Sequence, residues 1–262
     1  MGMTNQLASF SLDAFNLAGK TAIVTGANKG LGQAYAVALA KAGADVFAVC
    51  RSTDWKETKE LIEETGQRIE FFQADMSDRA AVKEIVPECL NVFGKVDILV
   101  NNAGTILRSP LVEYKEEDWD AVMEVNINSL YLLSQEAAKV MVEQKSGKII
   151  NIASMLSFQG GKFVPAYTAS KHAVAGLTKA FANELAEHNV QINAIAPGYI
   201  ATANTAQIRA DEKRNAEILS RIPAGRWADP ADLMGVVVFL ASRASDYMNG
   251  HVLAIDGGWL AR

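Results

Sequence analysis

The sequence predicts an α/β fold in a single domain: a doubly wound parallel sheet of about seven strands with helices on both faces. Two observations predict this fold. Short apolar runs typical of buried strands alternate along the chain with longer helical stretches, and this alternation is typical of βαβ units and a parallel sheet. The first apolar run also leads directly into a glycine-rich turn and an alanine-rich helical stretch, the context in which a glycine pattern predicts phosphate binding.

The predicted elements follow one another in a regular order. Apolar runs predict strands at residues 21–25, 44–50, 69–74, 96–100, 147–154, 190–196 and 251–255. Helical stretches predict helices at residues 33–41, 55–65, 79–93 and 116–144, a helix that carries Tyr167 and Lys171, and a last helix at 230–241. Because no internal repeat, low-complexity segment or linker interrupts this order, we expect residues 1–262 to form one domain.

Two segments lie outside the alternation of strands and helices. Residues 1–17 show no clear periodicity, and we expect a loose or surface-docked N-terminal tail. Residues 199–227 are polar, contain several arginines and predict short helices at most, with no strand. An insertion of this length after a sheet strand is typical of a functional lid, so we expect it to cover a substrate site.

Composition narrows the class of protein. The 262 residues are 50% hydrophobic and 21% charged, as in ordinary globular proteins, and the formal net charge of -5 gives no indication of nucleic-acid binding. No apolar run approaches the roughly 20 residues that span a bilayer. Residues 1–6 lack the features of a signal peptide, so we expect a cytoplasmic protein without a membrane partner.

Cysteines and histidines do not predict a metal centre. Cys50 and Cys89 have no metal-ligand spacing and are expected to be core or surface thiols in a reducing compartment. His172, His188 and His251 are scattered along the chain, and we expect no metal.

The turn after the first strand holds Gly26, Gly30 and Gly32. Glycines let the backbone approach a pyrophosphate, whose charge then meets the N–H groups and positive dipole of the following helix. The same glycines could merely form a tight turn, because short glycine motifs also occur by chance. The strands and helices that continue after the turn favour the phosphate-binding interpretation.

Polar and small residues follow the third and fourth strands. Asp75 comes after the third strand and the segment 101–104, Asn-Asn-Ala-Gly, after the fourth. Ligands of open parallel sheets bind beyond the C-terminal ends of strands, although this segment could also be a plain loop. Asn126 lies in an apolar part of the predicted helix 116–144. A buried amide must be hydrogen-bonded, so Asn126 is either a structural tie or part of a proton relay.

Tyr167 and Lys171 are four residues apart in a helical pattern, which places them on one helix face. An ammonium near a phenol favours the phenolate and lowers the tyrosine pKa, which suits a general acid or base. The spacing alone is weak evidence, since it arises by chance on many helices. Ser154, at the end of the fifth predicted strand, adds a hydroxyl that precedes the pair.

Together these motifs resemble the full motif set of the short-chain dehydrogenase/reductase family. The matching positions are 25–32, 101–104, Asn126, Ser154, Tyr167 with Lys171, and 197–198. The resemblance covers residues 17–262 approximately, and the motifs are specific jointly rather than singly. It implies a Rossmann-type fold and an NAD(P)(H)-dependent oxidoreductase that acts on CH–OH groups.

The resemblance implies a role for each catalytic residue. Tyr167 would be the acid/base, and Lys171 would bind the nicotinamide ribose and lower the tyrosine pKa. Ser154 would hydrogen-bond the substrate oxygen, and Asn126 would hold a water that links Lys171 to solvent. The physical chemistry agrees, because reduction of a ketone places negative charge on its oxygen, which two hydroxyl donors can stabilise.

The resemblance also implies a set of cofactor contacts along the strand ends. The set consists of Gly26, Asn28, Lys29, Gly30, Leu31, Gly32, Arg51, Asp75, Met76, Asn102, Ala103, Gly104, Tyr167, Lys171, Pro197, Gly198, Ile200 and Thr202. Thr202 could instead simply open the first helix of the lid.

The second half of the chain is further similar to bacterial dehydrogenases of sugar acids of the 2-deoxy-D-gluconate or 2-dehydro-3-deoxy-D-gluconate type. Residues 152–161, 194–199, 222–227 and 256–262 carry this similarity. A sugar acid needs a cation for its carboxylate. The candidates are Arg108, Lys162, Arg209, Arg214 and Arg226, each of which could equally be a solvated surface charge. Ser154 and Gln159 could bond substrate oxygens, and Gln159 could instead bond only a turn.

The cofactor specificity is predicted from the end of the second strand. NAD-preferring relatives usually carry an acidic residue there, which bonds the adenosine ribose hydroxyls. Here the position holds Cys50, followed by Arg51, while Lys29 lies in the glycine turn. Two cations and no carboxylate favour NADP slightly, against the NAD use expected of the sugar-acid subfamily.

Two other functions fit parts of the pattern. One is a short-chain reductase for another carbonyl, such as a gluconate 5-dehydrogenase or a 3-oxoacyl reductase. The other is a non-catalytic dinucleotide sensor, which predicts a damaged site, whereas Asn126, Ser154, Tyr167 and Lys171 are all present. The resemblance also implies a homotetramer built through the long helices and the last strand. The direction of the reaction does not follow from the residues.

Overall fold

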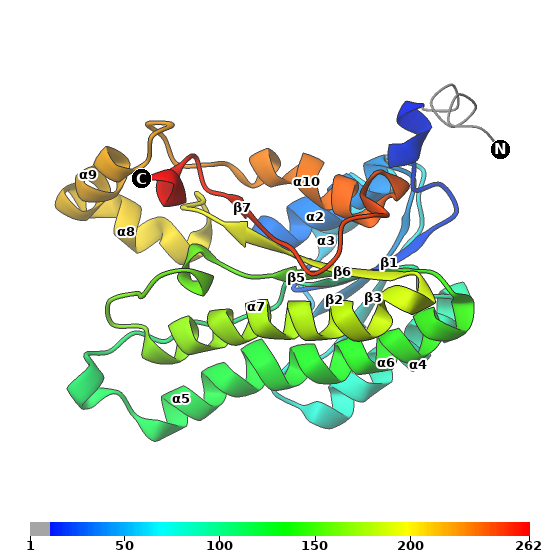
Figure 1. Cartoon of the computed structure of the whole chain (residues 1–262), viewed down its shortest axis with the longest axis horizontal. Coiled ribbons are helices and arrows are strands. Elements are labelled where there is room, and N and C mark those ends of the chain that lie inside the picture. Colours follow the sequence, from blue (N-terminus) through cyan, green and yellow to red (C-terminus); the bar gives the residue numbers. More distant parts are fainter. Residues whose placement is uncertain (1–10) are drawn as a thin grey trace.

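A seven-stranded parallel sheet forms the centre of the computed structural model, which describes residues 11–262 (Figure 1). The strands are β1 Thr21–Thr25, β2 Asp45–Cys50, β3 Ile69–Gln73, β4 Ile98–Asn101, β5 Gly147–Ile152, β6 Val190–Pro197 and β7 Val252–Ile255. Their order in the sheet is β3-β2-β1-β4-β5-β6-β7, and every neighbouring pair is parallel. The predicted fold class and the number of strands are confirmed.

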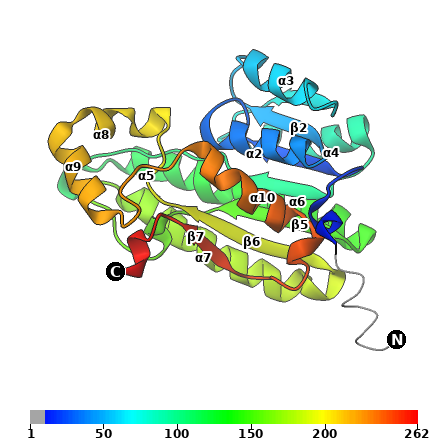
Figure 2. The ribbon, with the colours of Figure 1, turned by 90° about the horizontal axis from the view of Figure 1, so that it is seen from above.

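Helices cover both faces of the sheet (Figures 1 and 2). One layer holds α2 Gly30–Lys41, α3 Lys56–Glu63 and α10 Met234–Ala241. The other layer holds α4 Arg79–Phe93, α5 Glu116–Met123, α6 Ser129–Gln144 and α7 Pro165–Leu185. None of the helices within residues 11–262 combines the length and apolar composition that crossing a bilayer requires.

Side chains of one strand alternate between two cores. On β2, Val46 and Ala48 face the core under α2 and α10, whereas Phe47 and Val49 face the core under α4 and α6. Both faces are therefore buried, which explains why the strands read as continuous apolar runs rather than as alternating patterns. Burial of this apolar surface is the main favourable contribution to folding.

The chain order reverses at β1, which pairs with β2 on one side and with β4 on the other. The C-terminal ends of β1 and β4 therefore border the topological switch point, where open α/β sheets bind ligands. The glycine turn follows β1, and the segment 101–104 begins at the end of β4.

Two predicted helices differ from the observed ones. Helix α2 begins at Gly30 instead of residue 33, because the glycine turn supplies the first helical turn itself. The single helix predicted at 116–144 is divided by a π-helical segment, Glu124–Asn128, in which Ser129 donates its N–H to the carbonyl of Glu124. Such π segments occur often at functional sites, and this one contains Asn126.

The remaining differences are at element ends. The predicted helix 230–241 begins as a 3-10 turn, Pro230–Leu233, before α10. The predicted tail at 1–17 is described only from residue 11, and its first ten residues lie outside the described part of the chain. Within the described part, a short 3-10 helix, Leu12–Phe15, precedes Leu17, which is 2% exposed and belongs to the core.

Candidate active site

The turn between β1 and α2 forms a backbone cradle. A Cβ on Gly32 would lie 2.1 Å from the carbonyl oxygen of Gly26 and 2.5 Å from the side-chain nitrogen of Asn102, so only glycine fits there. The N-cap residue of α2, Lys29, makes no side-chain capping bond within the described chain. The first N–H groups of this long helix, with its positive dipole end, therefore suit an anion.

The loop after β4 is bonded to the end of β1. The Thr25 hydroxyl accepts the N–H groups of Asn102 and Ala103 at 3.0 and 2.9 Å, and the Asn102 amide donates to the Thr25 carbonyl at 2.8 Å. These bonds fix the floor of the crevice beside the glycine cradle. Because of these bonds, the Asn-Ala-Gly segment has a fixed position at the end of β1 and is not a plain loop.

The end of β2 lies directly under the glycine turn. Cys50 is 1% exposed, and burial raises the pKa of its thiol to about 11 although the backbone N–H groups of Ala27 and Asn28 donate to it. The Asn28 amide donates to the Ser52 hydroxyl at 3.1 Å. Arg51 is exposed at the rim. Cys50 is thus a core thiol, and no carboxylate stands at this strand end.

Apart from Tyr167 and Lys171, which lie on α7, the predicted cofactor residues lie along the C-terminal ends of the strands. Gly26, Asn28 and Lys29 follow β1; Gly30, Leu31 and Gly32 begin α2; Arg51 follows β2; Asp75 and Met76 follow β3; Asn102, Ala103 and Gly104 follow β4; Pro197 ends β6, and Gly198, Ile200 and Thr202 follow it. Thr202 is the N-cap of the first lid turn and lies beside Gly30. The structure therefore brings the two ends of this set together.

Asp75 is held in place by its own loop. Its carboxylate accepts the N–H and the hydroxyl of Ser77 at 2.9 and 2.8 Å. These bonds hold the pKa of Asp75 below its usual range, and the positive charge of Arg51 adds to the effect. The side chain is therefore an ionised acceptor near the Arg51 rim.

Tyr167 lies in the first turns of α7, which Pro165 opens at a position that suits proline. Burial raises the pKa of Tyr167 above its usual value, while a hydrogen bond with the Ser154 side chain and the positive charge of Arg108 lower it. The three side chains come from the loop after β4, the end of β5 and α7. The site thus joins a phenol, a hydroxyl and a cation.

Lys171 is buried one turn further along α7. Its ammonium donates to the carbonyl of Ile152 at 2.6 Å and lies 5.4 Å from the centre of the Tyr167 ring. Burial lowers the pKa of Lys171 to about 8. Ser154 and Arg108 lower the pKa of Tyr167 in the structure. The lowering by Lys171, expected from the resemblance, stays a prediction.

Ser157 fixes the turn that carries Ser154, and sequence reasoning missed it. The Ser157 hydroxyl donates to the Lys171 carbonyl at 2.6 Å and accepts the Ser154 N–H at 3.3 Å. The Ser154 hydroxyl in turn accepts the N–H of Leu156 at 3.2 Å. The Ser-x-x-Ser spacing, which resembles a capping box, was the available signal.

Asn126 ties the π segment to the loop after β4. Its side-chain oxygen accepts the N–H of Thr105 at 2.8 Å, and its amide donates to the Thr105 carbonyl and the Ser170 hydroxyl, both at 3.0 Å. The sequence left a structural tie and a proton relay open, and these bonds are those of a tie. These bonds fix the position of α7 relative to the loop that precedes Arg108.

A buried polar chain runs behind the site and was not predicted. The Asn101 amide donates to the Ser134 hydroxyl and to the Asn151 side-chain oxygen, each at 2.9 Å, and the Asn151 amide donates to the Thr178 hydroxyl at 3.0 Å. It links β4, β5, α6 and α7, so a shift of one element would break bonds in the others.

Four of the candidate substrate cations are engaged elsewhere. Arg209 donates to the Thr202 carbonyl at 3.1 Å, Arg226 pairs with both oxygens of Asp232 at 2.7 and 2.8 Å, Arg214 lies 3.7 Å from Glu217, and Lys162 lies over the Phe163 ring. Gln159 accepts the indole N–H of Trp259 at 3.3 Å. Arg108 alone among the five acts on Tyr167.

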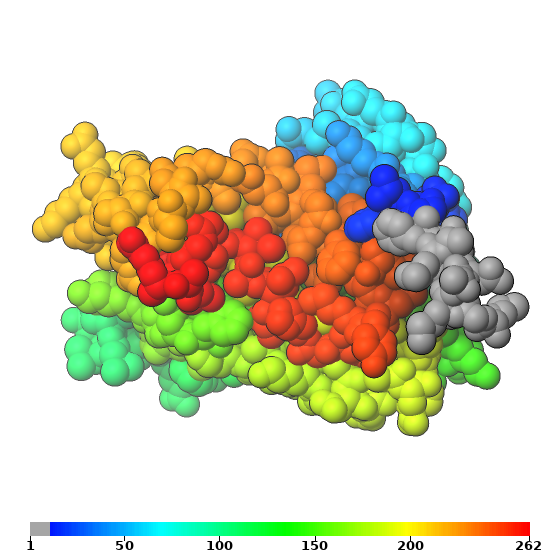
Figure 3. All heavy atoms as spheres, turned by 45° about the horizontal axis from the view of Figure 1, so that its top comes forward, coloured from blue at the N-terminus to red at the C-terminus, as the bar shows by residue number. Residues whose placement is uncertain are grey.

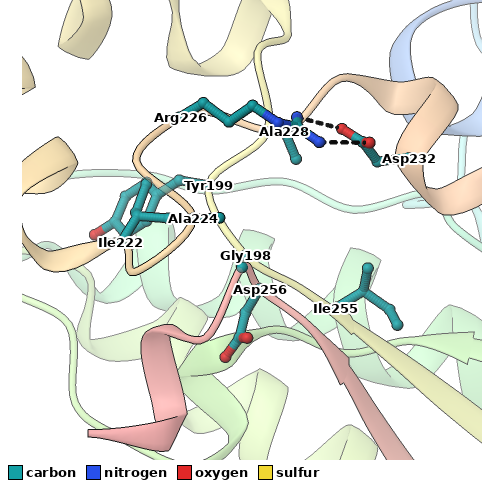
Figure 4. A pocket seen from close by; sticks show the side chains of 10 residues that line it. Gly198, Tyr199, Ile222, Ala224, Arg226, Ala228, Asp232, Ile255 and Asp256 are labelled. Carbon is teal, nitrogen blue, oxygen red and sulfur yellow. Dashed lines mark hydrogen bonds and ion pairs between the residues drawn. The ribbon is translucent and has the colours of Figure 1, made fainter.

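A cavity of about 220 Å³ lies between the end of the lid and the C-terminal ends of β6 and β7. Figure 4 shows the paired Arg226 and Asp232 on one side of it and Asp256 on another. The oxygens of Asp256 already accept the N–H groups of Gly258 and Leu260 at 2.9 Å. Within residues 11–262, no group of three or more His, Cys, Asp or Glu side chains is placed to hold a metal ion.

The chain is similar to known oxidoreductases over almost its whole length. A family model described as enoyl-(acyl carrier protein) reductase matches residues 26–260. A 2-dehydro-3-deoxy-D-gluconate 5-dehydrogenase of Bacillus subtilis is 58% identical over 250 residues, which are 95% of this chain and 98% of that protein.

Two solved structures have the same fold. A candidate 2-deoxy-D-gluconate 3-dehydrogenase of Agrobacterium tumefaciens, with bound NADP, is 50% identical with a TM-score of 0.89, over 95% of this chain and 100% of that one. A candidate NAD(P)-dependent gluconate 5-dehydrogenase of Beutenbergia cavernae, with NADP at low occupancy, is 51% identical with a TM-score of 0.92, over the same shares.

Proposed function

The chain belongs to the short-chain dehydrogenase/reductase family of NAD(P)-dependent oxidoreductases, and we propose that it transfers a hydride between a nicotinamide cofactor and a secondary alcohol or ketone of a sugar acid. The substrate would be of the 2-deoxy-D-gluconate or 2-dehydro-3-deoxy-D-gluconate type. The observation that carries the proposal is the convergence of Ser154, Tyr167 and Arg108 in a sheet whose first βα turn is a glycine cradle.

The residues present fit a dinucleotide. The cradle around Gly32 would receive the pyrophosphate on the N-terminus of α2, and the rim at Arg51 would receive the adenosine ribose. Lys171 and Thr202 would hold the nicotinamide end. When bound, the nicotinamide supplies or accepts the hydride.

Tyr167 would move the proton of the reaction. In the direction of reduction its phenol donates a proton to the developing alkoxide, and in the direction of oxidation it accepts one. Ser154 would donate a second hydrogen bond to the same oxygen. Because burial alone would make Tyr167 a weaker acid, the Ser154 hydrogen bond and the Arg108 charge favour the phenolate that proton transfer produces.

Arg108 would bind the carboxylate of the substrate. It is exposed, and it makes no ion pair with the described residues, unlike Arg214 and Arg226. A guanidinium can hold a carboxylate with two parallel hydrogen bonds. The same side chain would then fix the substrate and influence the proton donor, which favours an acidic substrate over a neutral one.

NADP is the cofactor we favour, slightly, over NAD. Support comes from Arg51 and Lys29 at the rim, from Cys50 in place of a carboxylate, and from the NADP present in the two similar structures. A 2′-phosphate would be attracted by two cations, and positions 50 and 51 at the end of β2 hold no carboxylate. The NAD use expected of the sugar-acid subfamily argues the other way.

A gluconate 5-dehydrogenase is the second candidate function, favoured by the Beutenbergia cavernae structure. A 3-oxoacyl reductase is a weaker one, and a non-catalytic sensor is the weakest, because Asn126, Ser154, Tyr167 and Lys171 are all retained. We further propose a cytoplasmic homotetramer. The half-exposed rings of Trp119 and Tyr131 on α5 and α6, and the edge strand β7, would face partner subunits.

The deciding experiment is a screen at the absorbance of reduced nicotinamide. The purified protein is incubated with the alcohols 2-deoxy-D-gluconate, 2-dehydro-3-deoxy-D-gluconate and gluconate, each with NAD and with NADP. Their keto forms and a 3-oxoacyl thioester are tested with NADH and with NADPH. The proposal expects the highest kcat/KM for a sugar acid of the deoxy or dehydro-deoxy type, and a higher value with NADP. Highest efficiency with gluconate or with the thioester would replace the proposed substrate, and a strong NAD preference would reverse the cofactor assignment.

A further inference from the structure

The lid leaves the sheet and returns to it at one place. Ala201 donates its N–H to the carbonyl of Ala228 at 2.8 Å, and Ala228 donates to Tyr199 at 3.0 Å. Between these ends the chain forms α8 Ala206–Ala210 and α9 Glu212–Arg221, which project from one end of the sheet (Figure 2). A loop with adjoining ends depends on packing of its own side chains for its position.

The C-terminal turn lies against this lid. In Figure 3 the C-terminal residues, in red, lie between the gold and orange lid segment and a green segment below. Gly257 accepts the N–H of Ala224 at 3.0 Å, and a Cβ on Gly257 would lie 3.0 Å from the side chain of Ile222. The Asp256 carboxylate shapes the turn by accepting two backbone N–H groups. The turn is therefore built for close contact with the lid.

Trp259 is the centre of that contact. It is 4% exposed and belongs to a buried cluster with Ile218 and Ile222, from α9 and its end, and with Met155. The Arg221 guanidinium lies 4.0 Å from the centre of its ring. Because Met155 follows Ser154 directly, one tryptophan touches both the lid helix and the turn that carries the candidate catalytic hydroxyl.

Aromatic rings extend the cluster across the lid. The Tyr199 ring centre lies 4.7 Å from that of Trp259 and 5.3 Å from that of Trp227. The Trp227 indole donates to the side-chain oxygen of Asn215 on α9 at 2.7 Å. Such ring pairs contribute beyond their buried area, so two linked tryptophans hold α9 in place.

The indole N–H of Trp259 adds a polar link. It donates to Gln159, in the loop that follows Ser154, at 3.3 Å. The sequence left Gln159 open between a substrate contact and a turn, and in the structure its side-chain oxygen accepts the indole N–H of Trp259. Beside the cluster, the cavity of about 220 Å³ separates the end of the lid from the strand ends. The Arg262 guanidinium, which follows the C-terminal turn, donates to the Ser220 carbonyl on α9 at 2.6 Å.

We propose that Trp259 is a positioning residue that couples the lid to the loop after Ser154 through its hydrogen bond with Gln159. The lid then takes its substrate-binding position only when the C-terminal turn and the loop after Ser154 are joined by this hydrogen bond. The consequence for substrate affinity rests on the function proposed above. The coupling itself does not, because it concerns contacts that exist without substrate.

Amide hydrogen exchange of the lid tests the coupling. Gln159→Leu removes the acceptor with little change of volume, whereas Trp259→Phe removes the N–H donor and also part of the buried ring. Gln159→Leu is expected to speed exchange of the α9 amides about fivefold, since one hydrogen bond is lost, and Trp259→Phe to speed it at least as much. The double variant should exchange no faster than Trp259→Phe alone. Trp55→Phe removes an indole that stacks on Phe71 and makes none of these contacts, so it is the control and should exchange like the wild type.

Two results would overturn the inference: unchanged exchange in both single variants, or effects that simply add in the double variant. Kinetics supply the second readout. The KM for the sugar acid should rise about fivefold in Trp259→Phe, with the affinity for NADPH unchanged. If the wild type turns over no sugar acid, the proposed function fails, while the exchange measurement still decides the coupling.

Discussion

The ammonium of Lys171 donates a 2.6 Å hydrogen bond to the carbonyl of Ile152, the last residue of β5, and is buried. Burial lowers its pKa from 10.5 to about 8. Between these two values the unfolded chain binds more protons than the folded one, so stability rises with pH through this window. At neutral pH, below this window, Lys171 is charged in the folded state, and desolvation of its ammonium lowers the free energy of unfolding by the full amount.

We therefore expect Lys171→Met to stabilise the protein without cofactor at pH 7. The shift of the pKa corresponds to about 3 kcal/mol, and loss of the hydrogen bond to Ile152 offsets about 1 kcal/mol of it. Urea unfolding should show a gain of about 2 kcal/mol, together with loss of turnover and of cofactor affinity. Lys179→Met, at an exposed position of α7, is the control and should change stability little. A clear loss of stability in Lys171→Met would contradict the burial argument.

The same pKa predicts how cofactor binding depends on pH. If Lys171 holds the nicotinamide ribose as proposed, it does so best as an ammonium, and that form is lost as pH rises through about 8. The Kd of NADPH, measured from about pH 6.5 to about pH 9.5, should therefore rise on the alkaline side. In Lys171→Met this rise should be absent. A wild-type Kd that stays flat over the range would show that Lys171 does not titrate there.

Arg108 is expected to decide between acidic and neutral substrates. Arg108→Ala should raise the KM for the sugar acid at least about tenfold, since a hydrogen-bonded charge pair is lost. The KM for a neutral ketose should change much less. Arg68→Ala removes a guanidinium that lies over the Phe93 ring instead, and it serves as the control. Equal changes for both substrates in Arg108→Ala would rule out a carboxylate contact.

Asn126 should contribute to stability as well as to the site. Asn126→Ala leaves the N–H and carbonyl of Thr105 without their present partner, which should lower the free energy of unfolding by about 2 kcal/mol. Asn183→Ala removes an amide that bonds only its own helix, at Lys179, and should cost far less. Thermal and urea unfolding of the two variants measure the difference. Similar stability of the two would mean that Asn126 is not the tie described above.

Helices and strands were predicted well where they depend on residues close together in the sequence, such as helix caps and apolar runs. Helix α4 occupies the predicted residues 79–93, because Asp78 caps its start and Gly94, in the left-handed region, ends it. The strands were predictable because burial on both faces leaves continuous apolar runs.

The sequence was misleading where contacts are long-range. The break in helix 116–144 contains Asn126, whose side chain bonds Thr105, 21 residues away. Gln159 was expected to bond substrate or only a turn, and neither alternative included its observed partner Trp259, 100 residues further along the chain. The pKa of Tyr167 likewise depends on Arg108, from another loop. These contacts join residues that are far apart in the sequence, so neither hydrophobic periodicity nor motif spacing predicts them.

The role of Tyr167 is the central claim. Tyr167→Phe keeps the ring and removes the hydroxyl, so it deletes the proton donor and little else. We expect kcat to fall by about 10²- to 10⁴-fold, with the Kd of NADPH within about twofold of wild type, as measured by cofactor absorbance and by binding titration. If Tyr167→Phe keeps near-wild-type turnover, the proton-transfer mechanism proposed for this site is wrong.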